Sequence, residues 1–373
     1  MKLFIEPNDV LMFRDGRPFA GGDDHFARGS FPPSPSTIYG ALRSHILSVK
    51  SGEFDTFKNE PAKISKAITD EVGTKKTLGT LAIAQFGVAK NNEGQIQHYF
   101  PIPRDIAKEK GKEDGKLYIL KPDSFINNIA LTDMPLGLQH LWRATEEALE
   151  AASGFLSEDE LASYLMGKAP EKIIEAKEIY QTEERTGIRK NRSIRSVETG
   201  GLYSVEYFRM KEGFGFALDA AGTKLLPESG ILRLGGDHRS ASYFKSSWND
   251  IDTKHIKDKI LRDKHFKLIL LTPAVFSQGW LPESIDRNTF EGAINGVKLK
   301  MTSACVGKPI GIGGYDFVKN HPKVMNKAVP AGSVYYFELS EGDVDSLFKN
   351  VWLKSISDEK TQEGFGITLI GGY

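Results

Sequence analysis

Cysteine is almost absent from this chain of 373 residues, in which Cys305 is the single thiol. One cysteine excludes an internal disulfide and any zinc site built from several cysteines, and it fits a reducing compartment. We expect Cys305 to pack as a small hydrophobic side chain. Long apolar runs are missing too, since no window approaches about 18 uninterrupted apolar residues. The sequence therefore predicts a cytoplasmic protein that does not enter a membrane.

Net charge is also absent, because 49 basic and 49 acidic residues cancel. Composition alone therefore gives no case for nucleic-acid binding, and any such case must come from local patches of charge. The content of 40% hydrophobic and 26% charged residues is ordinary for a globular protein. The length is sufficient for two domains with substantial cores.

The common catalytic and cofactor motifs are missing as well. No two of the eight histidines stand four residues apart, so there is no H-E-x-x-H zinc motif. Gly307-Lys308-Pro309 lacks the Ser or Thr of a phosphate loop, and the glycines from Gly311 to Gly314 lack the setting of a dinucleotide fold. No Gly-x-Ser-x-Gly elbow is present. We expect no metal and no cofactor.

A helix is predicted to begin near Pro35, inside the distinctive stretch 11–47. Ser34 can cap it through its hydroxyl, and Pro35 suits the first helical position because its missing N–H would be unpaired there. Apolar side chains then recur at three- and four-residue spacing, which predicts one face against a core. The residues of this face are Ile38, Ala41, Leu42, His45, Ile46 and Val49.

The start of this helix is a candidate anion site. No acidic residue lies between Asp24 and Glu53, so Arg28 and Arg43 have no local counter-charge. We expect Tyr39 and Arg43 to lie off the apolar face, close to the free N–H groups of the first turn, where the helix dipole favours negative charge. A phosphate would fit there. The alternative interpretation is an ordinary capped surface helix with a solvated arginine.

The rest of the first half mixes strands and helices. Two strand-like runs flank the polar turn 91–94 and predict a hairpin, whereas the charged run 105–116 is typical of an exposed loop. Ser157 and Glu160 have the spacing of a capping box. The remaining expectations are strands over 3–5, 10–13 and 117–120, helix over 62–72, and a helical pattern from 144.

A basic segment follows, with Arg185, Arg189, Lys190, Arg192 and Arg195 and no acidic residue before Val197. Such runs are usually solvated loops. Function is favoured here because the segment lacks a helical pattern and runs directly into two glycines and a strand over 205–210.

The second half is rich in strands. A hairpin is predicted around Glu212-Gly213, and a strand over 231–234 leads into a Gly-Gly-Asp-His-Arg turn. Further strands are expected over 266–271, 297–306, 334–339 and 365–370, with a helix over 343–351. Strands interleaved with a few helices predict α+β domains with antiparallel sheets.

Several stretches together resemble one protein family. They are FRDGRPFAGGDDHFARGSFPPSPSTIYGALRS near the start, PIPRD at 101–105, RTGIRKNRSIRSVETGGLYSVEYFR at 185–209, LGGDHRSASY at 234–243, LLTPAVFSQGWLP at 270–282 and the closing GFGITLIGGY. The chain resembles the third module proteins of the type III-B CRISPR effector, the Cmr complex, which belong to the RAMP superfamily.

The resemblance implies two ferredoxin-like (RRM-like) RAMP domains with antiparallel sheets and inserted Gly-rich loops. We place them at 1–200, with a helical insertion, and at 201–373. It also implies a non-catalytic role: anchoring the 5′ tag of the guide RNA (crRNA) and docking the large polymerase/cyclase-like subunit and the backbone RAMP subunits.

The resemblance and the chemistry of the residues together indicate a set of RNA-binding residues. Arginines and helix-start groups would hold phosphates, glycines would let the main chain approach, and Tyr39 and Tyr315 would stack on bases. Two stretches, 311–315 and 364–366, compete for the Gly-rich RAMP loop. The candidates are Arg14, Arg17, His25, Arg28, Ser36, Thr37, Tyr39, Arg43, Arg189, Arg192, Arg195, Gly235, Gly236, Arg239, Gly311, Gly313, Gly314 and Tyr315.

Two other functions remain open from the sequence. One is a metal-independent endoribonuclease that matures CRISPR repeats, with His25 or His45 as general base. The other is a structural adaptor whose basic loops touch acidic protein surface rather than RNA.

Overall fold

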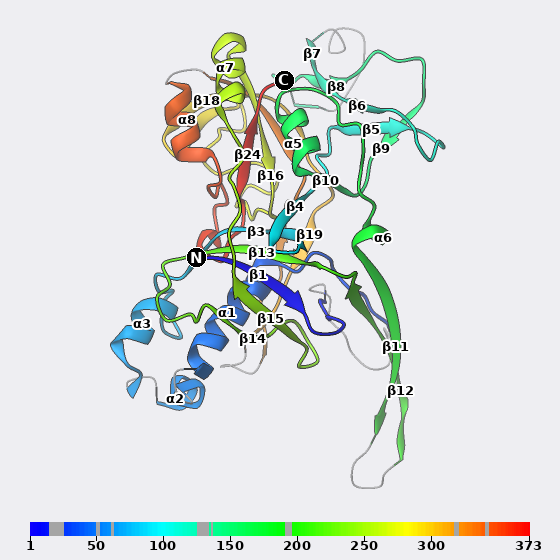
Figure 1. Ribbon diagram of the computed structural model, residues 1–373. Helices are drawn as coiled ribbons and strands as arrows, with labels where there is room; N and C mark the ends of the chain where they lie inside the picture. Colours follow the sequence, from blue (N-terminus) through cyan, green and yellow to red (C-terminus); the bar gives the residue numbers. More distant parts are fainter. Residues whose placement is uncertain are drawn as a thin grey trace.

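The computed structural model describes residues 1–14, 26–49, 53–60, 63–124, 134–135, 137–190, 196–316, 321–339 and 343–373. Two large antiparallel sheets form the body, one in each half, and helices lie against both (Figure 1). A long ribbon of two strands extends from the half that holds the amino terminus. Within the described ranges, no helix is long and apolar enough to cross a membrane.

The first sheet has seven strands in the order β10-β4-β3-β13-β1-β15-β14, and every neighbouring pair is antiparallel. Alternation along β1 sends Leu3 and Ile5 into the main core and Phe4 to the opposite face. The sheet takes strands from both sides of residue 200. In chain order they are β1 (Lys2–Pro7), β3 (Ala82–Asn92), β4 (Gln95–Pro101), β10 (Phe155–Ser157), β13 (Phe214–Ala221), β14 (Ser229–Arg233) and β15 (Ser240–Lys245).

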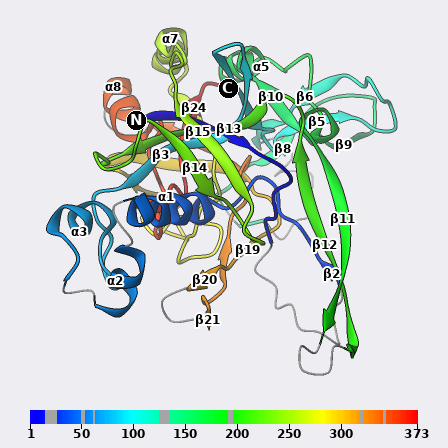
Figure 2. The same ribbon diagram turned by 60° about the horizontal axis from the view of Figure 1, so that its bottom comes forward.

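Helix α1 (Pro35–Val49) covers this sheet and contacts α2 (Glu53–Asn59), α3 (Lys66–Val72), β3 and β14 (Figure 2). Ile38, Leu42 and Ile46 are fully buried, as their spacing predicts. Each such side chain stabilises the fold by about 1.5–3 kcal/mol when it leaves water. The predicted start at Pro35 is confirmed.

The second sheet has five strands in the order β17-β18-β23-β16-β24. In chain order they are β16 (His265–Leu270), β17 (Glu291–Ile294), β18 (Val297–Cys305), β23 (Val334–Leu339) and β24 (Thr368–Gly371). Helices α7 (Lys254–Asp263) and α8 (Val344–Val351) pack against each other and against β24, and an ion pair of 2.6 Å joins Lys257 Nζ to Asp345. Asp343 caps α8 by accepting a hydrogen bond from the Ser346 amide.

Smaller elements surround the two sheets. Helices α5 (Glu158–Leu165) and α6 (Ala176–Ile179) lie in the first half of the chain. A small sheet holds β5 (Ile106–Glu109), β6 (Leu117–Ile119) and β9 (Leu149–Ala151), and β7 (Lys121–Asp123) pairs with β8 (His140–Trp142). The ribbon is formed by β11 (Tyr180–Lys190) and β12 (Val197–Met210), with the short β2 (Phe26–Ala27) beside it. The second half adds β19 (Ile310–Ile312), β20 (Tyr315–Asp316), β21 (His321–Pro322), β22 (Asn326–Ala328) and the 3-10 turn η2 (Thr361–Glu363).

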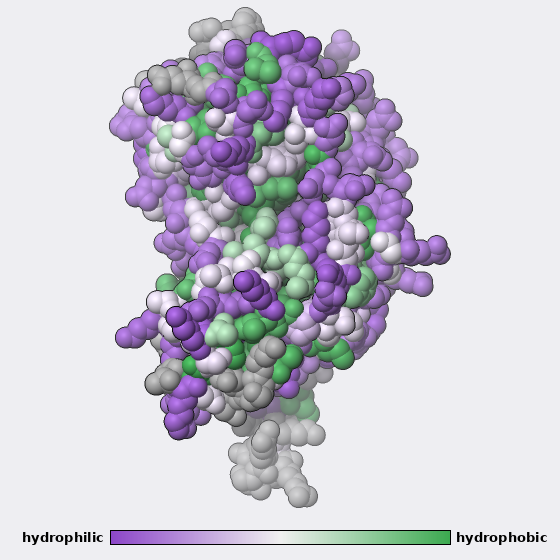
Figure 3. Space-filling model, turned by 60° about the vertical axis from the view of Figure 1, so that its left-hand side comes forward, coloured by the Kyte–Doolittle hydropathy of each residue, from purple (hydrophilic) through white to green (hydrophobic). Residues whose placement is uncertain are grey.

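One contiguous hydrophobic core runs through both halves. A buried polar cluster lies where the halves meet: the Asp105 carboxylate accepts hydrogen bonds from the Tyr164 and Tyr336 hydroxyls, and Lys267 Nζ lies 3.5 Å from it. The side chains of Asp105 and Lys267 are both fully buried. Figure 3 shows the face on the left of Figure 1, where hydrophilic residues dominate and hydrophobic ones gather mainly along the middle and lower part. The continuous core and the buried polar cluster join the two sheets into one body.

The α+β class with antiparallel sheets is confirmed. The hairpin around 91–94 is correct, with Gly94 at φ +97°, and Ser157 caps α5. Other expectations are wrong. Residues 10–13 form only an isolated bridge, between Leu11 and Phe208, instead of a strand. The segment 105–116 begins with buried residues and contains β5; the region from 144 holds β9 before any helix; and the turn at 212–213 joins β12 and β13, which belong to different sheets. In each case a long-range partner overrides the local pattern.

Candidate nucleic-acid interface

The ribbon with β2, Arg14 and residues 28–29, which we call the arm, extends away from the two large sheets (Figure 1). Its two long strands pair from Tyr180↔Met210 to Lys190↔Val197. The basic segment is therefore strand over 185–190, and not the solvated loop that such runs usually form. Ile188 and Leu202 face each other across the ribbon and are 43% and 56% exposed. A ribbon with so little covered apolar surface is not stable by itself in water.

Cationic side chains accompany these apolar ones. β2 pairs in parallel with β12, and Arg14 forms an isolated bridge with Gly29. Arg14 and Arg28 therefore lie at the same edge of the arm. Both are exposed, and so is Arg189 near the far end of β11. Three of the predicted arginines thus gather on the arm, although they are up to 175 positions apart in the sequence. The predicted residues Arg17, His25, Arg192 and Arg195 lie outside the described residues.

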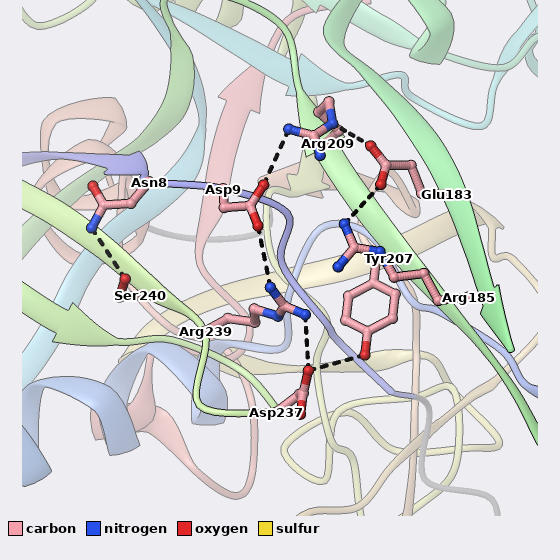
Figure 4. Close-up of polar contacts among 9 residues, drawn as sticks. All are labelled: Asn8, Asp9, Glu183, Arg185, Tyr207, Arg209, Asp237, Arg239 and Ser240. Carbon is pink, nitrogen blue, oxygen red and sulfur yellow. Dashed lines mark hydrogen bonds and ion pairs between the residues drawn. The ribbon is translucent and has the colours of Figure 1, made fainter. Parts of the chain in front are cut away.

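A second set of arginines fixes the root of the arm. We call this set the root network; it consists of Asp9, Glu183, Arg185, Tyr207, Arg209, Asp237 and Arg239 (Figure 4). Arg209 lies 3.2 Å from Asp9 and also contacts Glu183, while Arg239 bonds Asp9 at 3.2 Å and Asp237 at 2.9 Å. Three carboxylates balance three guanidinium groups. The root network therefore joins the end of β1, the arm and the β14–β15 turn.

Tyr207 stands at the centre of this network. The guanidinium carbons of Arg185 and Arg239 lie 4.9 Å from its ring centroid, and its hydroxyl donates to Asp237 at 3.1 Å. Hydrogen bonds from Arg209 and Arg185 lower the pKa of Glu183. Arg239, a predicted RNA-binding residue, is only 21% exposed and already has two carboxylate partners. Its position suits bracing of the arm, and an RNA contact by Arg239 stays a prediction.

The β14–β15 turn carries the predicted Gly235 and Gly236. Gly235 has φ +80°, and a Cβ there would lie 2.3 Å from the Met12 carbonyl oxygen. The Gly236 amide donates to that same oxygen at 2.8 Å. Asp237 and His238 follow with φ of +54° and +52°. These glycines thus let the turn approach the chain that leads into the arm.

The start of α1 differs from its predicted form. The Ser34 hydroxyl is buried and has no hydrogen-bond partner, so the predicted side-chain cap is wrong. Tyr39 is only 3% exposed, which contradicts its predicted place off the apolar face and removes it from base stacking. Arg43 lies over the Tyr39 ring at 5.8 Å and donates to the Thr74 carbonyl at 3.4 Å. Thr37 is half-buried in the same turn.

A carboxylate of the chain itself contacts the first turn of this helix. The Ser36 hydroxyl donates to Glu363, which comes from η2 and also lies 3.5 Å from Lys360 Nζ. Gln362 holds the same turn by donating to the Gly79 carbonyl at 2.8 Å. Local sequence carries no signal of Glu363, because it is 327 positions away from Ser36.

The two candidate Gly-rich stretches have different surroundings. Gly364 and Gly366 are buried, and a Cβ on Gly364 would lie 2.8 Å from Ile83. Gly311, Gly314 and Tyr315 are exposed in the 310–328 segment, which holds β19 to β22, and Gly313 is half-buried there. Figures 1 and 2 place this segment, α1 and the arm at the same end of the molecule.

His45, a candidate general base, is half-buried. His45 Nε2 shares a hydrogen bond of 2.9 Å with the Tyr243 hydroxyl, and burial lowers the pKa of His45. No group of three or more His, Cys, Asp or Glu side chains is arranged to hold a metal ion within the described ranges. Cys305 is half-buried, and burial raises the pKa of its thiol to about 11.

Comparisons with known proteins agree with the motifs. No curated protein matches the sequence. One chain of "Cryo-EM structure of the Type III-B Cmr-beta bound to cognate target RNA" is 18% identical, with a TM-score of 0.50 over 90% of this chain and 86% of that chain. A second, from the same complex with AMPPnP, has 17% identity and a TM-score of 0.49 over the same shares. A chain of "Crystal structure of Csm3-Csm4 subcomplex in the type III-A CRISPR-Cas interference complex" has 12% identity and a TM-score of 0.39 over 100% and 99%.

The first of these structures shows the fold. The sequence model of the family described as CRISPR-associated protein (Cas_Cmr3) matches residues 3–373, nearly the whole chain. The resemblance to type III-B Cmr proteins is thereby confirmed, and this chain belongs to the Cas_Cmr3 family of CRISPR-associated proteins.

Proposed function

We propose that this chain is a non-catalytic RNA-binding subunit of a type III-B CRISPR interference complex, and that it anchors the 5′ tag of the crRNA. The arm carries the proposal: exposed Arg14, Arg28 and Arg189 offer charge for phosphates, and Ile188 and Leu202 offer apolar contact for bases. A related structure, by its description, is bound to cognate target RNA. Docking of the large polymerase/cyclase-like subunit and the backbone RAMP subunits belongs to the same proposal.

The strand orders support the RAMP part of this proposal. In the first sheet, β15-β1-β13-β3 has the order fourth, first, third, second along the chain, and β24-β16-β23-β18 repeats it in the second sheet. This is the order of a ferredoxin-like unit. We therefore propose two such domains, with the division between β15 and β16 rather than at residue 200.

Affinity for RNA tests the proposal. Arg28→Ala/Arg189→Ala should weaken binding of RNA that carries the tag, and the slope of log affinity against log salt should fall by about 0.7 for each phosphate that the variant no longer binds. The control is Arg262→Ala, which removes an exposed charge at the end of α7, in the other half of the molecule (Figure 1). Wild-type protein should also prefer the tag over a scrambled tag. An equal decrease in the control, or no preference, would contradict the proposal.

The second candidate is the metal-independent endoribonuclease. His45 supports it only weakly, because Tyr243 already occupies its Nε2 atom. Incubation of the protein with repeat RNA in EDTA decides between the two: cleavage that His25→Ala or His45→Ala abolishes would establish the enzyme. Ultraviolet crosslinking in the assembled complex separates the third candidate, a protein adaptor, which would give no crosslinks to guide RNA.

A further inference from the structure

The beginning of α1 is a positive helix end whose own first turn contains no acidic residue. Glu363 supplies the missing negative charge from a distant part of the chain, through its bond with the Ser36 hydroxyl. The Glu363 side chain is 13% exposed. A helix start attracts carboxylates and phosphates for the same reason, since free N–H groups and the dipole both favour an anion.

The carboxylate leaves its surroundings incompletely paired. The Tyr39 hydroxyl, Arg43 Nε and Ser34 Oγ are buried and have no hydrogen-bond partner. Ser36, Tyr39 and Arg43 are spaced by three and four residues, which places them along one stripe of α1. Burial raises the pKa of the Tyr39 hydroxyl, and the charges of Arg43 and Glu363 act on this pKa in opposite directions. Buried polar atoms without partners are rare in native proteins and call for an explanation.

The turn that carries Glu363 is a compact unit. Lys360 and Gly364, on either side of η2, have φ of +59° and +91°, and Gln362 anchors the turn at Gly79. Glu363 itself is held by Ser36 and by Lys360 at 3.5 Å. Displacement of this carboxylate from α1 would break its contacts with Ser36 and Lys360, while the backbone of the turn stays anchored at Gly79.

We propose that Glu363 is an internal substitute for an RNA phosphate, and that it closes the α1 site until RNA displaces it. An RNA phosphate carries two charged non-bridging oxygens and two ester oxygens in a tetrahedral arrangement, so it can accept from the Tyr39 hydroxyl and Arg43 Nε, which Glu363 leaves unpaired, as well as from Ser36. The sequence prediction of an anion site at α1 then holds for the RNA-bound state, while the free protein keeps the site closed. This inference rests on the proposed RNA-binding function.

Neutralising Glu363 tests this proposal directly. Glu363→Gln keeps a group that can bond Ser36 but removes the competing charge, so the affinity for a short RNA with the tag should rise roughly two- to fivefold. The salt slope should steepen by about 0.7, the value for one more bound phosphate. Glu171→Gln is the matched control, because it removes the same charge from an exposed position on the segment between α5 and α6.

Further variants keep the outcomes distinct. In the Glu363→Gln background, Arg43→Gln should abolish the increase in affinity. If Glu363→Gln does not fold, Glu363→Asp is the substitute, since its carboxylate is one methylene too short to hold Ser36 and should raise affinity as well. If wild-type protein binds RNA and Glu363→Gln binds it with the same affinity, the proposal that Glu363 closes the α1 site is overturned, and the proposed RNA-binding function is not. Absence of RNA binding in wild-type protein and in all variants would overturn the proposed function, and with it the proposal that Glu363 closes the α1 site.

Discussion

Removing the buried carboxylate of Asp105 should strongly destabilise the protein. Asp105→Ala leaves the ammonium of Lys267, which is fully buried, without its counter-charge, and leaves the Tyr164 and Tyr336 hydroxyls without an acceptor. Breaking a buried ion pair from one side costs about 3–5 kcal/mol. Chemical denaturation followed by circular dichroism measures the change in the free energy of unfolding.

Two controls make that measurement specific. Lys257→Ala breaks the ion pair between α7 and α8, in which Asp345 is 84% exposed, and should cost less than about 1 kcal/mol. Asp105→Asn/Lys267→Met removes both charges together and should be less destabilised than Asp105→Ala. A decrease below about 1 kcal/mol for Asp105→Ala would refute the role of this cluster in joining the two halves.

The same cluster predicts a pH dependence. Burial lowers the pKa of Lys267 from 10.5 to about 8, although Asp105 opposes the shift. Between these values the unfolded chain keeps a proton that the folded chain has released, so the contribution of Lys267 to stability is lowest below pH 8 and increases up to pH 10.5. The free-energy difference between wild type and Lys267→Met should therefore change in favour of wild type from pH 8 to pH 10. A flat difference would contradict the assigned shift.

Three further predictions concern local features. Gly235→Ala should lower the free energy of unfolding by about 1–3 kcal/mol in thermal denaturation, because φ is +80° and the new Cβ would clash with the Met12 carbonyl oxygen. Gly94→Ala, where the new Cβ meets open space, should lower it less. Equal decreases would contradict the close approach at Gly235. Arg239→Ala should speed amide exchange in β11 and β12 relative to Arg262→Ala, since it breaks the root network; unchanged exchange would show that the arm is fixed elsewhere. Ser157→Ala should lower stability by about 1 kcal/mol through removal of the α5 cap, and no change in melting would argue against that cap.

Local patterns predict local structure well in this chain. The apolar spacing of Ile38, Leu42 and Ile46 identifies the buried face of α1, and the capping residue Ser157 identifies the start of α5. Both depend only on residues within a few positions of each other. The hairpin of β3 and β4 is predictable for the same reason.

Interactions between distant segments are what the sequence does not reveal. The absence of acids between Arg185 and Val197 indicates free positive charge, yet strand pairing and the turn before β15 bring Glu183, Asp9 and Asp237 to the arginines of the root network. Glu363 reaches α1 across most of the chain. Sequence therefore identifies basic residues, some of which the fold brings to the arm, but it does not separate those that face outward on the arm from those that brace it.

The central claim is that the arm contacts guide RNA. Ultraviolet crosslinking of the assembled complex, followed by mapping of the crosslinked peptides, tests it most directly. We predict crosslinks from the 5′ tag to residues 26–28 and to the far part of the ribbon near Arg189 and Leu202, and their disappearance in Arg28→Ala/Arg189→Ala. Tag crosslinks that are confined to other parts of the chain, or absent from it, would contradict the claim.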